Sequence, residues 1–110
     1  MGIVAAAQAV SDANKIGQVN VTGLGLPSEM AGHIDSGASK SFAIWNPIDL
    51  GYSAAMLSYN LATGKAKAGP GAKISMGRMG TLTLDENSEG AMADPFTYDS
   101  SNINEFKDIF

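Results

Sequence analysis

Few side chains in this sequence have the types and spacing that catalysis requires. The single histidine, His33, has no second histidine with which to bind a metal, and we interpret it as a surface residue on a short helix. The acidic residues are spread along the chain without the pairing of a two-carboxylate catalyst. Ser28, Ser41 and Ser53 lack a nucleophile-elbow sequence, and there is no cysteine. The sequence therefore predicts no enzyme, no metal site and no cofactor.

A glycine-containing turn allows one cofactor-binding interpretation. The segment from Thr22 to Ser28 connects a strand-like run to a helix-like run and contains Gly23 and Gly25. A dinucleotide-binding loop would need a third glycine where Ser28 stands, and Pro27 also departs from that pattern. We interpret the segment as a tight turn at the carboxyl end of a strand.

Two such strand ends could contact a ligand, because ligands of open parallel sheets bind beyond the carboxyl ends of the strands. These ends are Leu24-Gly25-Leu26 and Trp45-Asn46. The amide of Asn46 can donate and accept hydrogen bonds, as a sugar hydroxyl requires, but asparagine is also a good N-cap. Trp45 could stack on the apolar face of a sugar or fill the core. Both alternatives stay open for each residue.

The surrounding patterns predict alternating helices and strands. A first helix runs from Met1, with Lys15 in its last turn and Gly17 as its stop. The elements expected after it are a strand at 19–24, a helix at 27–36, a strand at 40–45 and a helix at 47–63. This order predicts an α/β fold with a partial parallel sheet flanked by helices.

After Gly64 the sequence predicts shorter elements than before it. A flexible connector is expected at 65–71, followed by short strands at 74–76 and 81–84, an acidic turn at 85–90, an extended stretch at 94–98 and a helix at 103–106.

The composition of the chain argues against some classes of binding partner. The 110 residues carry a net charge of −4, which argues against a nucleic-acid partner. The apolar run from Met1 to Val10 is too short for a membrane span and lacks the basic start of a signal peptide. Because the chain begins inside a predicted helix, we expect it to be the C-terminal part of a longer protein.

Three segments together resemble the C-terminal part of a known family. They are GIVAAAQAV, VNVTGLGLPSEM and SGASKSFAIWNPIDLGYSA. These segments are similar to type I periplasmic sugar-binding proteins, particularly to the rhamnose-binding components of ABC transporters, and autoinducer-2 receptors are related. The resemblance covers essentially the whole chain.

The resemblance implies an incomplete two-lobed fold of the periplasmic-binding-protein-like I class, with flavodoxin-like lobes and a sugar in the cleft between them. Residues 1–46 resemble the end of the C-terminal lobe. Residues 47–64 resemble a helix that packs on the N-terminal lobe, after a hinge crossing at Asn46-Pro47. Residues 65–110 resemble the return crossing, short strands and C-terminal tail.

The resemblance also implies substrate-binding residues. Asn46 matches a hinge position that carries a polar, ligand-contacting side chain in relatives, and Trp45 is its neighbour. Gly25 matches a loop position where ribose-binding relatives carry an acid, so ribose-type recognition is not expected. Backbone groups or Leu26 could contact the sugar there, and a less polar wall would suit a 6-deoxy sugar. Val4 and Ala6 align with cleft-lining positions of the autoinducer-2 receptors.

The implied function is that of a fragment of a solute-binding component of a bacterial ABC sugar importer. Its expected partners are a small monosaccharide such as rhamnose and the permease subunits in the membrane, and its expected location is the periplasm. The alternatives are a fragment of an autoinducer-2-type receptor, or the effector-binding domain of a sugar-responsive transcription regulator.

The missing part of the fold would leave an apolar helix face uncovered. The helix that begins at Ile48 would expose Leu50, Leu57 and Leu61. Because exposed apolar faces favour association, we expect a homodimer, with a domain-swapped arrangement as one form of it.

Overall fold

The computed structural model describes residues 2–109, and the chain forms two compact units. Unit 1 consists of residues 2–44 and 95–109, and unit 2 consists of residues 45–94. The chain therefore leaves unit 1 after Ile44 and returns to it at Pro95. Within residues 2–109, no helix is both long enough and apolar enough to cross a bilayer.

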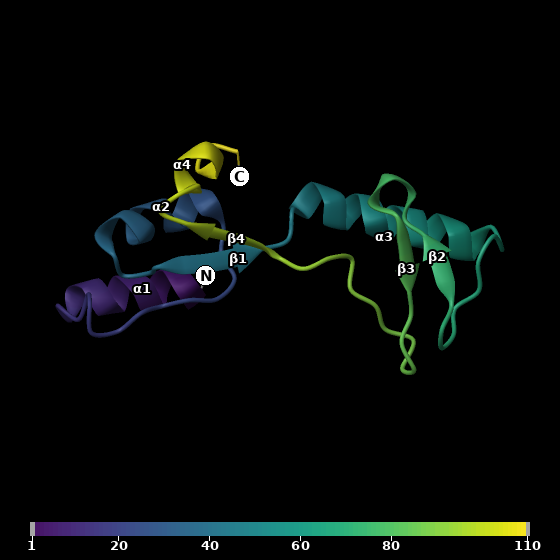
Figure 1. Cartoon of the computed structure of the whole chain (residues 1–110), viewed down its shortest axis with the longest axis horizontal. Helices are drawn as coiled ribbons and strands as arrows, with labels where there is room; N and C mark the ends of the chain where they lie inside the picture. The colour runs from purple at the N-terminus through teal and green to yellow at the C-terminus, as the bar shows by residue number, and fades with distance from the viewer. Residues whose placement is uncertain (1, 110) are drawn as a thin grey trace. The chain divides into compact units, whose positions relative to one another are not determined.

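Unit 1 combines helices with an antiparallel strand pair. Its elements are α1 (Gly2–Asp12), α2 (Pro27–Ser36), β1 (Ser41–Ile44), β4 (Phe96–Asp99) and α4 (Ile103–Phe106) (Figure 1). Strand β1 pairs with β4 so that Phe42 lies opposite Tyr98. The strand and helix predicted near the C-terminus are thereby confirmed, the strand with its bounds shifted slightly along the chain.

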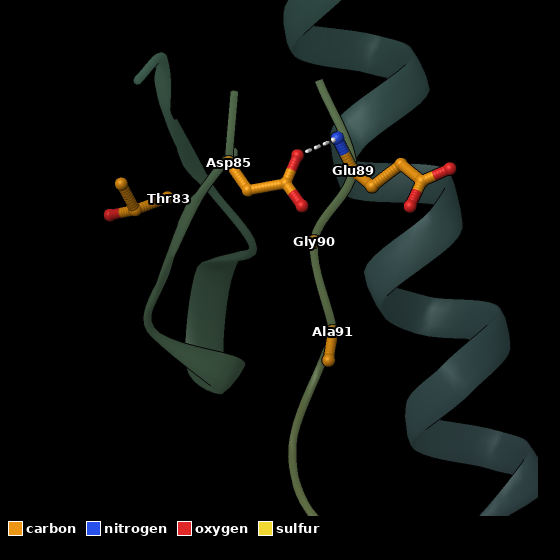
Figure 2. Close-up of a pocket in the computed structure, with 5 residues that line it drawn as sticks. All are labelled: Thr83, Asp85, Glu89, Gly90 and Ala91. Carbon is orange, nitrogen blue, oxygen red and sulfur yellow. Dashed lines mark hydrogen bonds between the residues drawn. The ribbon is translucent and has the colours of Figure 1, made fainter. Parts of the chain in front are cut away.

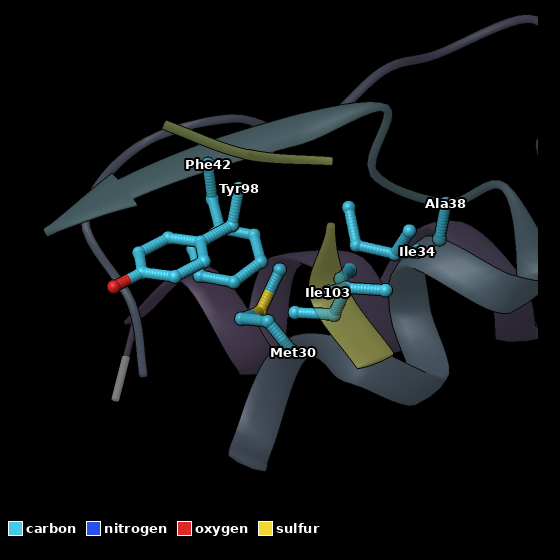
Figure 3. Packing of buried hydrophobic residues seen from close by; sticks show 7 residues of the cluster. Met30, Ile34, Ala38, Phe42, Tyr98 and Ile103 are labelled. Carbon is cyan, nitrogen blue, oxygen red and sulfur yellow. The ribbon is translucent and has the colours of Figure 1, made fainter. Parts of the chain in front are cut away.

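The core of unit 1 lies between this strand pair and the helices. The rings of Phe42 and Tyr98 are stacked with their centroids 5.2 Å apart, and both side chains are buried. Figure 3 shows both rings next to Met30, with Ile34 and Ile103 continuing the apolar cluster. Burial of these large apolar groups is the main favourable contribution to the folding of unit 1.

Helix α2 begins and ends where its local sequence predicts. Pro27 occupies the first turn, where a fixed φ and a missing amide hydrogen are tolerated. Gly37 ends the helix at φ 82°, and its amide donates to the carbonyl oxygen of Ile34. The prediction that Met30 and Ile34 face the core is confirmed, because both are buried.

Helix α1 ends earlier than predicted. Its last residue is Asp12, and Asn14 already adopts a left-handed conformation with φ 54°. Asparagine tolerates this conformation better than most residues, so the chain turns before it reaches Gly17. The expectation that Lys15 lies in the last helical turn is therefore wrong.

The predicted strand at 19–24 is not a regular strand. It approaches β1 through a parallel bridge between Leu24 and Ala43. There the amide of Ala43 donates to the carbonyl oxygen of Gly23 at 2.9 Å, and the amide of Gly25 donates to the carbonyl oxygen of Ala43 at 3.2 Å. Gly23 has φ 150°, which interrupts the extended backbone. One parallel bridge to the 40–45 segment is therefore present, whereas the regular pairing of β1 with β4 is antiparallel.

Unit 2 is a long helix with a hairpin against it. Its elements are α3 (Pro47–Ala62), β2 (Lys73–Ser75), the 3-10 helix η1 (Gly77–Met79) and β3 (Thr81–Thr83). Strands β2 and β3 are antiparallel neighbours, which confirms the two predicted short strands. The buried Asn60 connects the layers, because its Nδ2 donates at 2.9 Å to the carbonyl oxygens of both Met56 and Ser75.

A second contact fixes η1 against the first turns of α3. The guanidinium of Arg78 lies 4.0 Å from the ring centroid of Tyr52 and pairs with the carboxylate of Asp49. The backbone amide of Arg78 also donates to the hydroxyl of Tyr52 at 3.3 Å. A Cβ at Gly77 would overlap that hydroxyl, so glycine is required at this close approach.

Several apolar side chains of α3 are exposed. Ile48 is 69% exposed, Leu50 is 50% exposed and Leu61 is 39% exposed. Leu57 is half-buried. The expected exposure of an apolar helix face is thus confirmed for Leu50 and Leu61.

Candidate ligand-binding site

Asn46 takes the capping role that its sequence position allows. Its Oδ1 accepts hydrogen bonds from the backbone amides of Ile48 at 2.9 Å and Asp49 at 3.4 Å, so it is the N-cap of α3. This capping orientation leaves Nδ2 pointing away from the helix amides, and within residues 2–109 Nδ2 makes no hydrogen bond. The half-buried Asn46 can therefore cap the helix and still donate to a ligand oxygen.

Trp45 is held in place by a residue 48 positions further along the chain. Its Nε1 donates to the carbonyl oxygen of Ala93 at 2.6 Å. The half-buried ring takes part, with Leu50 and the 90–92 segment, in a pocket of about 300 Å³. The structure thus places Trp45 at a pocket wall, where the ring has apolar neighbours and its one polar atom already has a partner.

Gly25 is a packing position. It is buried, and a Cβ built on it would lie 3.0 Å from Cγ2 of Ile3 and 3.0 Å from Cγ of Met30. An acidic side chain in this direction would enter the apolar core of unit 1, where an unpaired carboxylate is strongly unfavourable. The packing around Gly25 therefore disfavours an acidic side chain at this position. Leu26 follows as the half-buried residue before α2.

Val4 and Ala6 lie on different sides of α1. Val4 is half-buried and packs against the core cluster of unit 1, whereas Ala6 is exposed. The neighbouring Ile3 contacts the Gly25 position, so the start of α1 and the Gly25 loop lie together.

The six predicted site residues are divided between the two units. Val4, Ala6, Gly25 and Leu26 belong to unit 1. Trp45 and Asn46 belong to unit 2, directly after the chain leaves β1.

Leu50 and Met92 are pocket residues that the sequence did not identify. No local pattern could reveal the pocket, because it depends on the contact between Trp45 and Ala93.

The acidic turn after β3 has a structural role. A second hollow, of about 480 Å³, is lined by Thr83, Asp85, Glu89, Gly90 and Ala91 (Figure 2). Oδ1 of Asp85 accepts from the backbone amides of Asn87 at 2.8 Å and Glu89 at 2.9 Å, so this carboxylate stabilises the turn. Among residues 2–109 there is no cluster of three or more side chains suited to a metal ion.

Comparisons with solved structures cover nearly the whole chain. A sugar ABC transporter protein from Actinomyces odontolyticus is 38% identical over 96% of this chain, with a TM-score of 0.73. An ABC transporter solute-binding protein from Clostridium phytofermentas, solved with bound L-rhamnose, is 33% identical over 99% of this chain, with a TM-score of 0.83. The aligned region is 34% of the first structure and 38% of the second, so this chain spans about a third of their length.

The family comparison agrees with these structures. No curated protein sequence matches the chain significantly. The sequence profile of the periplasmic binding protein domain matches residues 1–66, which is more than half of the chain. These findings confirm the resemblance inferred from the sequence and the incomplete α/β fold class, and they confirm that the relatives are binding proteins and not enzymes. The chain therefore belongs to the periplasmic binding protein family.

Proposed function

We propose that this chain is part of the solute-binding component of a bacterial ABC sugar importer and that its ligand is rhamnose or a similar small sugar. The observation that carries the proposal is the likeness to the Clostridium phytofermentas protein with bound L-rhamnose, at 33% identity over 99% of the chain. The sugar ABC transporter protein from Actinomyces odontolyticus independently supports the sugar class.

The proposed binding site includes Asn46. Its Nδ2 is a directed donor, because Oδ1 is engaged by the amides of Ile48 and Asp49. Sugar hydroxyls are recognised by such preorganised polar groups, set among apolar and aromatic walls. Trp45 would supply an apolar wall, and Gly25 and Leu26 would supply backbone groups at the other predicted strand end.

The proposed domain organisation has residues 1–46 at the end of the C-terminal lobe and residues 47–64 as a helix of the N-terminal lobe. Residues 65–110 would include the return crossing and tail. The two compact units support this organisation, because the chain passes between them twice. Val4 and Ala6 would then contribute to the cleft from the C-terminal lobe.

The proposed partners and location follow from this function. A solute-binding component delivers its ligand to permease subunits in the membrane, so the full-length protein would act in the periplasm.

We further propose that the isolated chain forms a homodimer through the exposed apolar face of α3, with or without exchange of elements. The exposure of Leu50 and Leu61 supports this proposal, since burial of apolar surface drives association. Light scattering of the isolated chain at micromolar concentrations should give the mass of a dimer. A stable monomer throughout this range would contradict the proposal.

A thermal-shift screen tests the sugar proposal. The full-length gene product that contains these residues would be melted with a panel of monosaccharides, and L-rhamnose should raise its melting temperature. A ligand that binds only the folded state stabilises it by about 2.7 kcal/mol at a hundredfold excess over Kd. If no monosaccharide raises the melting temperature, the sugar proposal is wrong.

A further inference from the structure

The pocket of unit 2 beside Trp45 has an apolar lining. Its volume is about 300 Å³, and its walls come from Trp45, Leu50, Gly90, Ala91 and Met92. The indole Nε1 is the one side-chain hydrogen-bond donor among these residues, and it already donates to the carbonyl oxygen of Ala93. An apolar group would be favoured in this pocket, whereas a hydroxyl would lose hydration without gaining a side-chain partner.

The pocket lies at the same end of α3 as the amide of Asn46. Leu50 is four residues after Asn46, and its backbone amide donates to the carbonyl oxygen of Asn46 at 3.0 Å. Residues four apart share one face of a helix, so the Leu50 wall follows Asn46 along that face. In the chain, Asn46 therefore lies between two residues that line the pocket, directly after Trp45 and one helical turn before Leu50.

We propose that this pocket receives the C6 methyl group of a 6-deoxyhexose, while Nδ2 of Asn46 donates to a hydroxyl of the same sugar. This inference rests on the proposed sugar-binding function and adds the residues that select among sugars. A hydroxyl added at C6 would lie against Leu50 and Met92, which offer it no side-chain hydrogen-bond partner. An apolar pocket discriminates against such an addition by about 10- to 100-fold.

A matched pair of sugars tests the selection. L-mannose differs from L-rhamnose only by a hydroxyl on C6, so their affinities for the full-length gene product isolate the effect of the methyl group. Calorimetric titration should show L-rhamnose binding at least about 10-fold more tightly than L-mannose.

Two substitutions test whether the pocket residues cause the preference for L-rhamnose over L-mannose. Met92→Gln keeps the length of the side chain and adds polar atoms, and Met79→Gln makes the same change in η1, outside the pocket. Leu50→Gln has a matching control in Leu61→Gln on the same helix. Each pocket variant should reduce the preference for L-rhamnose to within about threefold by weakening L-rhamnose binding, and each control should keep the wild-type preference.

The outcomes distinguish a failure of the methyl-pocket inference from a failure of the proposed sugar-binding function. Equal affinities of the wild type for the two sugars would overturn the methyl pocket and leave sugar binding intact. The same conclusion follows if the folded Met92→Gln and Leu50→Gln proteins keep the wild-type preference. If neither these two sugars nor any other monosaccharide binds, the proposed function fails, and the inference fails with it.

Discussion

At the scale of single residues, Asn46 has a folding role that the structure shows and a binding role that we propose. Its Oδ1 satisfies the amides of Ile48 and Asp49, which would otherwise lack partners at the start of α3. Its Nδ2 stays available for a ligand. The sequence could not choose between a cap and a ligand contact, because the choice depends on the orientation of the amide, and the structure shows that the two roles are compatible.

Substitutions of Asn46 separate the two roles. Asn46→Asp keeps an oxygen cap and removes the amide donor, whereas Asn46→Ala removes both. The alanine variant should lose about 1 kcal/mol of unfolding free energy, and the aspartate variant should stay close to the wild type. Both variants should bind sugar more weakly. Chemical unfolding and calorimetric titration check these outcomes, and wild-type sugar affinity in Asn46→Asp would exclude a ligand role for the amide.

Asp99 gives a prediction for acidic pH. The hydroxyl and then the backbone amide of Ser101 donate to this carboxylate and hold the pKa of Asp99 below its ordinary value of 3.8. The resulting stabilisation is fully present above the unfolded pKa and is lost as the pH falls through the lower folded pKa. Ser101→Ala should therefore raise the pKa of Asp99, as an NMR titration of its carboxyl carbon would measure. An unchanged pKa would show that the Ser101 side chain has no part in the shift.

At the scale of elements, local signals predicted helices better than strands. Helix α2 begins at Pro27 and ends before Gly37, and α3 begins at Pro47 after the N-cap Asn46, because caps act within a few residues of each helix end. The segment 19–24 has strand-like composition, but its pairing depends on Ala43 about twenty residues away, and Gly23 interrupts it.

The pocket beside Trp45 could not be predicted either, because it depends on residues that are far apart in the sequence. Its geometry depends on the Ala93 carbonyl, which is far from Trp45 in sequence. The candidate position of Asn46 could be predicted, because it rests on a local strand-to-helix sequence and on a family resemblance.

The contact between α1, α2 and the Gly25 loop can be tested with two glycines. Gly25→Ala would bring a methyl group to 3.0 Å from the side chains of Ile3 and Met30, and it should cost about 1–3 kcal/mol of unfolding free energy. Gly32→Ala is the control, because nothing lies within 4 Å of its Cβ position in α2. It should stabilise the protein by up to about 1 kcal/mol, owing to the higher helix propensity of alanine. Urea unfolding of both variants measures the difference, and equal stabilities would contradict the described packing.

At the scale of the whole molecule, the chain is a partial representative of its family. It spans about a third of the length of its solved relatives, yet it folds into two compact units connected by two chain crossings. The exposed side chain of Leu61 in α3 is consistent with a surface that further polypeptide covers in a longer protein, or that a second copy covers in the isolated chain. The binding experiments therefore use the full-length gene product.

Calorimetric titration of L-rhamnose into this full-length product tests the central claim most directly. The account predicts saturable binding with one sugar per protein molecule, and a clear loss of affinity in the Asn46→Asp variant. Absence of binding by L-rhamnose and by every other monosaccharide, with a protein shown to be folded, would contradict it.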